Sequence, residues 1–204
     1  MPKLAVVIYL MSTAVPVAAQ TTLGMRGGVG FASVSIEEVI EQESITGIAI
    51  GPELGVPVSE VFSLRFAGTF AQKGGGGTIE DIDVTLNIDY IQASALARVA
   101  TPGEGLSVGV MAGPWAAYRL SCDVEAAGQG LSLSAACGEA TFADFDIKTW
   151  DFGVAVGGGV ELPVFGSRRL RLDALYALGL GSVDENDTKT RHLTLQWGLA
   201  FPIG

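Results

Sequence analysis

Apolar and polar side chains alternate along most of the chain with a period of two residues. The clearest example is residues 192–203, in which every second position is large and apolar: Leu193, Leu195, Trp197, Leu199, Phe201 and Ile203. The positions between them carry Thr194, Gln196, Gly198 and Ala200. Successive side chains of a β-strand point to opposite faces, so this periodicity predicts a strand and not a helix.

Eight segments share the pattern: residues 23–32, 47–56, 62–73, 86–99, 106–119, 149–162, 169–182 and 192–203. The segment 86–99 changes phase near Tyr90 and Ile91, which predicts a β-bulge there. Each segment is long enough to cross a bilayer at a tilt. After residue 20, no run of about 18 or more apolar residues is free of charge and glycine, so the hydrophobicity is spread over short elements.

The connections between these segments alternate in length. Residues 56–61, 100–105 and 163–168 are short and rich in Pro, Gly and Ser, whereas 35–45, 74–84, 121–148 and 183–190 are longer and polar. Short turns on one side and long loops on the other are typical of outer-membrane barrels. We therefore predict an all-β protein, an eight-stranded antiparallel up-and-down transmembrane β-barrel, with both termini in the periplasm and the long loops extracellular.

The chemistry of the two faces decides between lipid and water outside the barrel. A soluble barrel would cover its outer face with many charged residues, but here one face is Leu, Val and aromatic and the other is Gly, Ala and isolated charges. Aromatic residues near both ends of the apolar faces resemble interfacial girdles: Phe70, Tyr118 and Trp150 near the long loops, and Phe62, Phe165 and Phe201 near the short turns. The apolar face is therefore expected to meet lipid.

The charged residues of the other face are then expected to fill the interior. They are five arginines and five carboxylates: Arg26, Glu53, Arg65, Asp89, Arg98, Arg119, Asp151, Glu161, Arg171 and Asp173. Two interpretations stay open, a salt-bridged plug and a selective channel or ion path. Since eight strands leave room only for side chains, we favour the plug.

The N-terminus has the features of a signal peptide. Lys3 precedes an apolar core from Leu4 to Val17, and Val17-Ala18-Ala19 is a small-residue cleavage site. We expect residues 1–19 to be the signal peptide and residues 20–204 the barrel domain, in preference to a short membrane anchor. Export to an oxidising compartment favours a disulfide between Cys122 and Cys137, the alternative being two free buried thiols.

The formal net charge of −10 is concentrated in the predicted long loops. The loop carboxylates are Glu37, Glu38, Glu41, Glu43, Glu80, Asp81, Asp83, Asp123, Glu125, Glu139, Asp144, Asp146, Asp184, Glu185 and Asp187. This charge makes nucleic-acid binding improbable. It favours a solvated surface, or, as the sharper alternative, divalent cations that bridge residues 184–187 to lipopolysaccharide.

Catalytic motifs are scarce. The single histidine, His192, could meet Asp187 and Ser182 in a surface hydrolase, but a lone histidine beside a loop is more often incidental. The run Gly74–Gly77 lacks the helix and Lys-Ser/Thr of a phosphate loop and is expected to be a flexible loop tip. We expect no enzyme activity, no cofactor and no metal site.

Several short motifs resemble the PorT-like outer membrane β-barrel family, a group of small barrels of the OmpA/OmpX type, over nearly all of the mature chain. They are residues 23–31 (LGMRGGVGF), 51–64 (GPELGVPVSEVFSL), 70–74 (FAQKG), 90–98 (YIQASALAR), 112–115 (AGPW) and 151–153 (DFG). The resemblance implies an eight-stranded outer-membrane barrel but little shared biochemistry; some members assist protein secretion. The chain departs from many barrels in ending with Pro202-Ile203-Gly204 after Phe201.

We therefore predict a structural or surface-interaction barrel, with a narrow porin-like channel and a surface enzyme as the alternatives. The expected partners are outer-membrane lipid and lipopolysaccharide, periplasmic chaperones and the barrel assembly machinery, and a surface ligand that the sequence does not identify. The chain is expected to be a monomer.

Overall fold

The computed structural model describes residues 20–34, 43–79, 82–103, 105–128, 131–137, 148–181 and 190–203. The predicted signal peptide, residues 1–19, lies outside the described residues. So do Ser182, Asp187 and most of the loop carboxylates.

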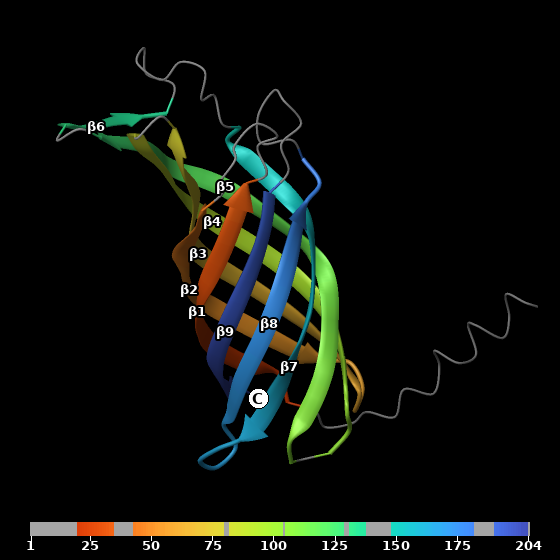
Figure 1. Ribbon diagram of the computed structural model, residues 1–204. Helices are drawn as coiled ribbons and strands as arrows, with labels where there is room; N and C mark the ends of the chain where they lie inside the picture. The colour runs from red at the N-terminus through yellow and green to blue at the C-terminus, as the bar shows by residue number, and fades with distance from the viewer. Residues whose placement is uncertain are drawn as a thin grey trace, which may run out of the picture.

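The described chain is built from antiparallel β-strands (Figure 1). Their bounds are β1 Thr22–Val34, β2 Glu43–Pro57, β3 Phe62–Ile79, β4 Ile82–Ala100, β5 Ser107–Gly128, β6 Leu131–Ala136, β7 Trp150–Pro163, β8 Arg169–Gly179 and β9 Thr190–Pro202. Among the described residues, no helix is long and apolar enough to cross a membrane.

Eight of these strands close into a barrel, which confirms the predicted fold. The sheet runs β4-β3-β2-β1-β9-β8-β7-β5-β6, and a further pairing of β4 with β5 closes the circle. Strands β1 and β9, from the two ends of the chain, pair along their whole length, from Thr22 opposite Pro202 to Val34 opposite Thr190. Only β6 lies outside the closed ring.

The barrel has two distinct ends (Figure 1). At the end we call the turn end lie the short connections β2–β3, β4–β5 and β7–β8, and the C-terminal residues. Two of these turns contain a glycine with positive φ, Gly103 (119°) and Gly166 (66°), a conformation that glycine adopts without steric cost. The opposite end, which we call the loop end, carries the longer connections β1–β2, β6–β7 and β8–β9, the two-residue connection between β3 and β4, and strand β6.

The prediction of loops at residues 74–84 and 121–148 was wrong for much of both segments. Residues 74–79 belong to β3 and pair with residues 82–87 of β4, so the tetraglycine run is not a loop tip but part of a ladder. Strand β5 continues to Gly128 and pairs back onto β6. Apolar and polar side chains still alternate in residues 82–88 (IDVTLNI), 121–126 (SCDVEA) and 131–134 (LSLS), so the sequence carried a strand signal there that the loop prediction missed, whereas the run Gly74–Gly77 carries none.

The predicted phase change near Tyr90 and Ile91 has a different origin from the one expected. The register shift lies between Asp89 and Tyr90 of β4, and the extra residue, Leu120, belongs to the facing strand β5. Along β4 itself Ile88, Tyr90 and Leu96 all point inward and are buried. The change in sequence phase therefore arises from large apolar residues on the inward-facing side of β4, and the bulge is in β5.

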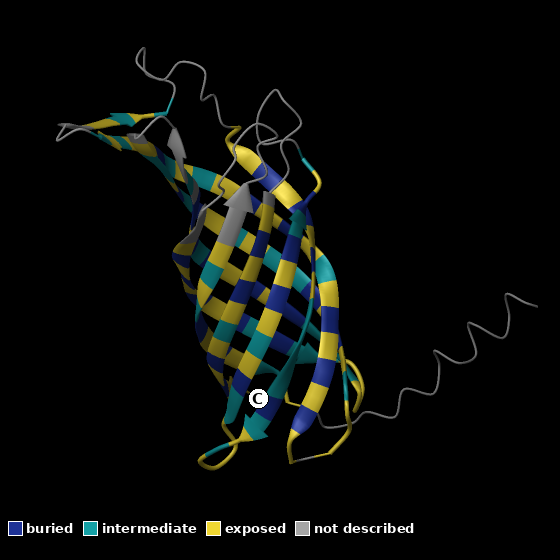
Figure 2. Cartoon of the chain, in the orientation of Figure 1, coloured by how far each residue is buried: buried dark blue, intermediate teal, exposed yellow. Residues whose placement is uncertain are grey.

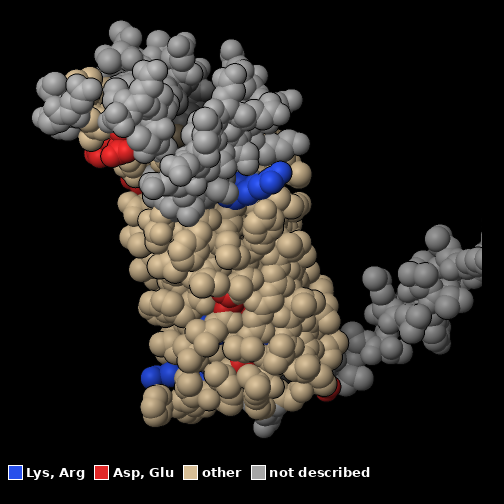
Figure 3. Space-filling model, in the orientation of Figure 1, with Lys and Arg blue, Asp and Glu red and all other residues tan. Residues whose placement is uncertain are grey.

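Alternate residues of each strand face outward and inward, as Figure 2 shows by its alternating colours. The outward positions are large and apolar, for example Val110, which is 66% exposed, and Trp150, which is 62% exposed. The inward positions include glycines such as Gly153, where an added Cβ would collide with the backbone of β8. Most of the wall seen in Figure 3 carries no charged side chain.

We expect a charge on the outer wall to destabilise the barrel according to its height. Val156 lies midway along β7 and faces outward, whereas Leu106 lies at the turn end. Val156→Arg should lower the free energy of unfolding in lipid vesicles by about 2–4 kcal/mol, because the guanidinium must enter hydrocarbon.

The matched variant Leu106→Arg should cost only about 0–1 kcal/mol, because interfacial water reaches it. Urea titrations followed by tryptophan fluorescence would measure both values. Equal losses at the two positions would contradict the placement of the wall in the bilayer.

Candidate functional site in the barrel interior and at the loop end

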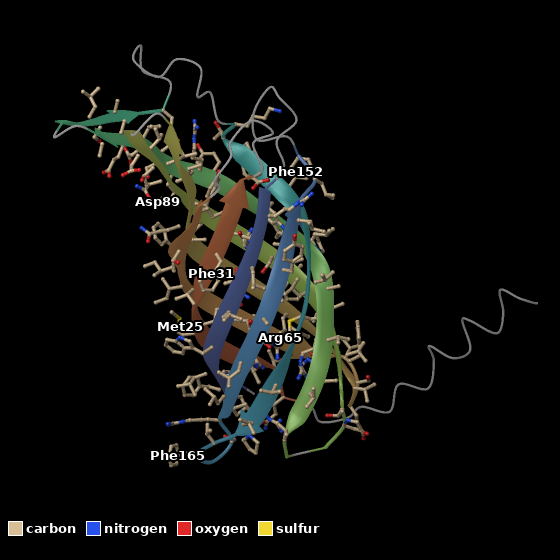
Figure 4. All side chains as sticks on the ribbon, viewed as in Figure 1. Met25, Phe31, Arg65, Asp89, Phe152 and Phe165 are labelled. Carbon is tan, nitrogen blue, oxygen red and sulfur yellow. A yellow bond between two sulfur atoms is a disulfide. The ribbon has the colours of Figure 1, made fainter. Side chains whose placement is uncertain are left out.

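A network of buried charged side chains crosses the interior, and Arg65 of β3 is its centre. Its Nη2 lies 3.0 Å from Oε2 of Glu161 on β7, and its Nη1 lies 2.8 Å from Oδ2 of Asp173 on β8. Arg65 is only 3% exposed. Figure 4 shows it inside the barrel, whereas Met25 and Phe31 point out of the wall.

The same network continues through Arg171 to the opposite strands. Arg171 Nε donates to Glu161 Oε2 at 3.0 Å, and its Nη1 pairs with Glu53 of β2. Glu53 Oε2 in turn lies 3.5 Å from Nη1 of Arg26 on β1. We call Arg26, Glu53, Arg65, Glu161, Arg171 and Asp173 the lumen network. Three arginines and three carboxylates from five strands therefore compensate one another across the barrel.

The other predicted lumen charges lie in different surroundings. Arg98 is buried and donates to Ser107 Oγ at 3.3 Å. Arg119 is on the inward-facing side of β5 near the loop end and is half-buried. Asp89 differs from the prediction, because it lies on the outward-facing side of β4, where it accepts a hydrogen bond of 3.1 Å from Ser121 Oγ (Figure 4). Its strand has already passed beyond the barrel wall at this height.

A second buried charge pair lies toward the loop end. Lys73 Nζ is 4.0 Å from Oδ2 of Asp151, and it also lies over the rings of Trp115, at 4.3 Å, and Tyr90, at 5.0 Å from the ring centroids. Cation–π contacts of this kind stabilise a desolvated ammonium group. Lys73 was not among the predicted lumen charges. Lys73 lies an even number of positions from Arg65 on the same strand, so the two side chains face the same side, and this was the sequence signal that could have identified it.

His192 does not occupy a surface site. It is buried on the inward face of β9, and its ring makes an edge-to-face contact of 5.6 Å with Trp115. Ser182 and Asp187, the partners considered for a hydrolase, lie outside the described residues. Among the residues that the structure describes, no group of three or more His, Cys, Asp or Glu side chains could hold a metal ion.

Large apolar side chains fill the remainder of the interior. A buried cluster forms mainly from β4, β5, β7 and β8: Ile88, Tyr90, Leu96, Met111, Trp115, Ala117, Cys122, Ala155, Leu175 and Ala177. The prediction of an inner face made of Gly, Ala and isolated charges was therefore incomplete. An interior cavity beside Lys73, Gln92 and His192 has a volume of about 20 Å³, which is room for one water molecule.

Beyond the loop end, strands β3 to β6 continue as a small sheet, which we call the extension: residues 74–79 of β3, 82–89 of β4, 121–128 of β5, and β6. The disulfide Cys122–Cys137 joins β5 to the residue that follows β6, and Cys137 N–H donates to Cys122 O at 3.0 Å. This confirms the predicted pairing of the cysteines. Asp83, Asp123 and Glu125 are exposed on one face of the extension. The loop carboxylates whose side chains the structure describes therefore lie together on this face.

Closed antiparallel strands, an apolar outer wall and a charged interior together define a small β-barrel of the outer-membrane type. The chain belongs to the outer membrane protein beta-barrel domain family, whose model matches residues 5–201. This membership assigns the chain to the outer membrane. It does not test the narrower resemblance to the PorT-like family.

Two solved structures illustrate the shared fold. The outer membrane protein OprG from Pseudomonas aeruginosa is 10% identical with a TM-score of 0.54, and the alignment covers 90% of this chain and 97% of OprG. Neisserial surface protein A is 15% identical with a TM-score of 0.52 and coverages of 89% and 97%. At these identities the similarity shows the fold alone. A comparison with curated proteins gives no significant match.

The lumen network makes a testable prediction at Arg65. Arg65→Met should lower the free energy of unfolding by about 3–5 kcal/mol, because it leaves Glu161 and Asp173 buried with too few partners. Arg169 is the matched control, since its Nη1 also pairs with Glu161, at 3.5 Å, but its side chain is 28% exposed. Arg169→Met should cost no more than about 1 kcal/mol. Denaturant unfolding in vesicles would measure both, and similar losses would show that the network is not coupled through Arg65.

The disulfide should stabilise the extension and not the barrel. It closes a loop between residues 15 positions apart, so reduction should lower the free energy of opening the β5–β6 hairpin by about 3 kcal/mol. Hydrogen exchange with and without reductant would show faster exchange of β6 amides and unchanged exchange of β1 and β9. Uniform acceleration over the whole barrel would contradict this.

Proposed function

We propose that this protein is a closed outer-membrane barrel that acts at the cell surface through the extension, and that it is not a channel. The single observation that carries the proposal is the contrast between the two parts of the molecule. The interior is occupied by paired charges and apolar side chains, whereas β3, β4 and β5 continue beyond the wall to support β6. If the interior conducts nothing, the extension is the part of the described structure that remains available for interaction at the loop end.

Two features support a closed interior. The lumen network joins strands on opposite sides of the barrel at distances of no more than 3.5 Å, which leaves no aqueous gap between the paired groups. The cavity lined by Lys73, Gln92 and His192 is also too small for a hydrated ion, since it holds about one water molecule. A second cavity beside Lys73, of about 140 Å³, is lined by Asp89, Ser121 and Asp123, residues of the extension. The narrow-channel alternative therefore has no described path through this part of the interior.

The orientation is part of the proposal. In bacterial outer-membrane barrels the short turns are periplasmic and the longer connections extracellular. The turn end holds the three short turns and the C-terminal residues, so we assign it to the periplasm and the loop end to the outside. The signal peptide of residues 1–19, passage through periplasmic chaperones and the barrel assembly machinery, and a monomeric state belong to the same proposal.

The chemistry of the extension supports a role in recognition. Asp123 and Glu125 project from it into solvent, and the net charge of the whole chain is −10. This charge favours soluble partners with positive charge, in addition to the outer-membrane lipid and lipopolysaccharide that surround the barrel. The candidate cation bridge at residues 184–187 lies outside the described residues. The PorT-like resemblance, carried by the order of its motifs, belongs to the same proposal, but it implies little shared biochemistry.

The absence of conductance is the first test. The refolded protein in planar bilayers should show no unitary current, because the lumen network and the apolar cluster block the interior. A large refolded porin, measured in the same bilayers, is the control for insertion. Reproducible currents that change with Arg65→Met would overturn the closed-barrel proposal.

The surface role needs its own measurement. Antibodies against the β5–β6 hairpin should label intact cells, whereas a C-terminal epitope should be reached only after the outer membrane is permeabilised. A variant in which residues 123–136 are replaced by an Asn-Gly turn controls for specificity. Cross-linking in intact cells should then yield partners with the full chain that the variant lacks. Labelling of the C-terminal epitope on intact cells would reverse the orientation.

A further inference from the structure

One edge of the extension has no partner strand among the described residues. Strand β6 pairs with β5 on one side and stands last in the strand order. Figure 1 shows it at the tip of the extension, away from the barrel wall. An unpaired edge presents a row of N–H and C=O groups with which another extended chain can pair.

We propose that this outer edge of β6 is a docking site for an extended segment of another protein, which adds to the sheet as a further strand. The inference rests on the proposed function, because the edge must face the outside of the cell to meet such a partner. It goes beyond that function in naming the groups that bind and the chemistry of the bound segment.

The hydrogen-bonding pattern identifies the groups that point to the open edge. Cys137 N–H donates to Cys122 O, so Cys137 and every second residue before it form the hydrogen-bonded pairs with β5. Those residues are Ala135, Leu133 and Leu131. The backbone groups of Ser132, Ser134 and Ala136 therefore point the other way, toward an incoming strand.

The edge lacks the usual features that prevent pairing. Natural edge strands are protected by charged side chains, proline or bulges, but the sequence of β6 is Leu-Ser-Leu-Ser-Ala-Ala. The disulfide after Ala136 also fixes β6 against β5. A fixed edge loses little conformational entropy when a partner binds, so it is preorganised for strand addition.

The side chains beside the edge define the chemistry of the partner. Directly opposed residues share a face, which places Ser134 with Glu125 and Ala136 with Asp123 on an acidic face. The other face carries Leu133, which is 51% exposed, and Ala135, whose neighbour Val124 on β5 is fully buried. The fitting segment is therefore extended, with Lys or Arg on one face and apolar residues on the other. A second copy of this chain fits less well, because it would bring its own carboxylates to the acidic face.

A defined peptide tests the proposal without knowledge of the natural partner. The probe is a short fluorescein-labelled peptide of alternating Lys and Val, titrated into the full-length protein in nanodiscs and followed by anisotropy. Ser134→Pro removes an N–H that points to the open edge and leaves the ladder with β5 intact, so binding should weaken about tenfold. Ser134→Ala keeps that N–H and should bind as the unmodified protein does.

Two further measurements separate strand addition from simple charge attraction. A peptide of the same sequence with N-methyl groups at alternate backbone positions keeps its charge but should lose most of its affinity. Bound unmodified peptide should slow hydrogen exchange at Ser132, Ser134 and Ala136. Asp123→Asn with Glu125→Gln should weaken binding and its salt dependence and leave that protection in place.

Equal binding by Ser134→Pro and Ser134→Ala, or by the methylated and unmethylated peptides, would overturn the docking site. Failure of the docking site can be distinguished from failure of the proposed surface role. If Ser134→Pro retains the cross-linked partners that the hairpin-replacement variant loses, the extension acts at the surface but not through this edge. If the hairpin is inaccessible on intact cells, the surface role fails whatever the peptide does.

Discussion

The pairing of β1 with β9, together with that of β4 with β5, is the constraint on which the rest of the molecule depends. Within hydrocarbon no water is available to bond a free N–H or C=O, so a sheet can cross a bilayer only if it closes on itself. The first and last strands satisfy this requirement, because they pair along their whole described length. The alternation of side chains then follows, because every residue of the wall must face either lipid or the interior.

A closed ring of eight strands sets the size of the interior, and the interior chemistry follows from that size. Side chains on facing strands meet at hydrogen-bonding distance, as Arg65 does with Glu161 and Asp173. A charge in so narrow a space is tolerable only beside an opposite charge, and the lumen network supplies equal numbers of both. Toward β4 and β5 the same space is filled by the apolar side chains of Leu96 and Met111 and by the ring of Trp115, which need no opposite charge.

The sequence predicted the barrel well because one physical rule, lipid on one face, acts on every residue of the wall. The same alternation predicted that Arg65 and Glu161 share the inward face, and both are buried in the structure. It could not pair them, because strands three or more apart in the ring come together only when the barrel closes. Where the rule does not apply, prediction from sequence was weaker. The glycines at 74–77 have no side chains that could alternate, so their place in a strand left no pattern to detect. Residues 121–126 (SCDVEA) do alternate, but their polar and acidic residues and the glycines that follow are also typical of a loop.

The apolar cluster and Asp89 show a second limit of the same argument. Leu96 and Trp115 are as hydrophobic as the residues outside, so an apolar residue alone does not tell wall from interior, and only its parity with neighbours such as Arg98 does. Asp89 keeps the outward parity of its strand but lies above the apolar wall, where water replaces lipid and a carboxylate is stable. Whether a residue is at an odd or an even position of its strand therefore determines whether its side chain points inward or outward. Its distance along the barrel axis determines whether an outward side chain meets lipid or water. Both are needed before a charge can be assigned to the lumen, and the second becomes available only once the register between strands is known.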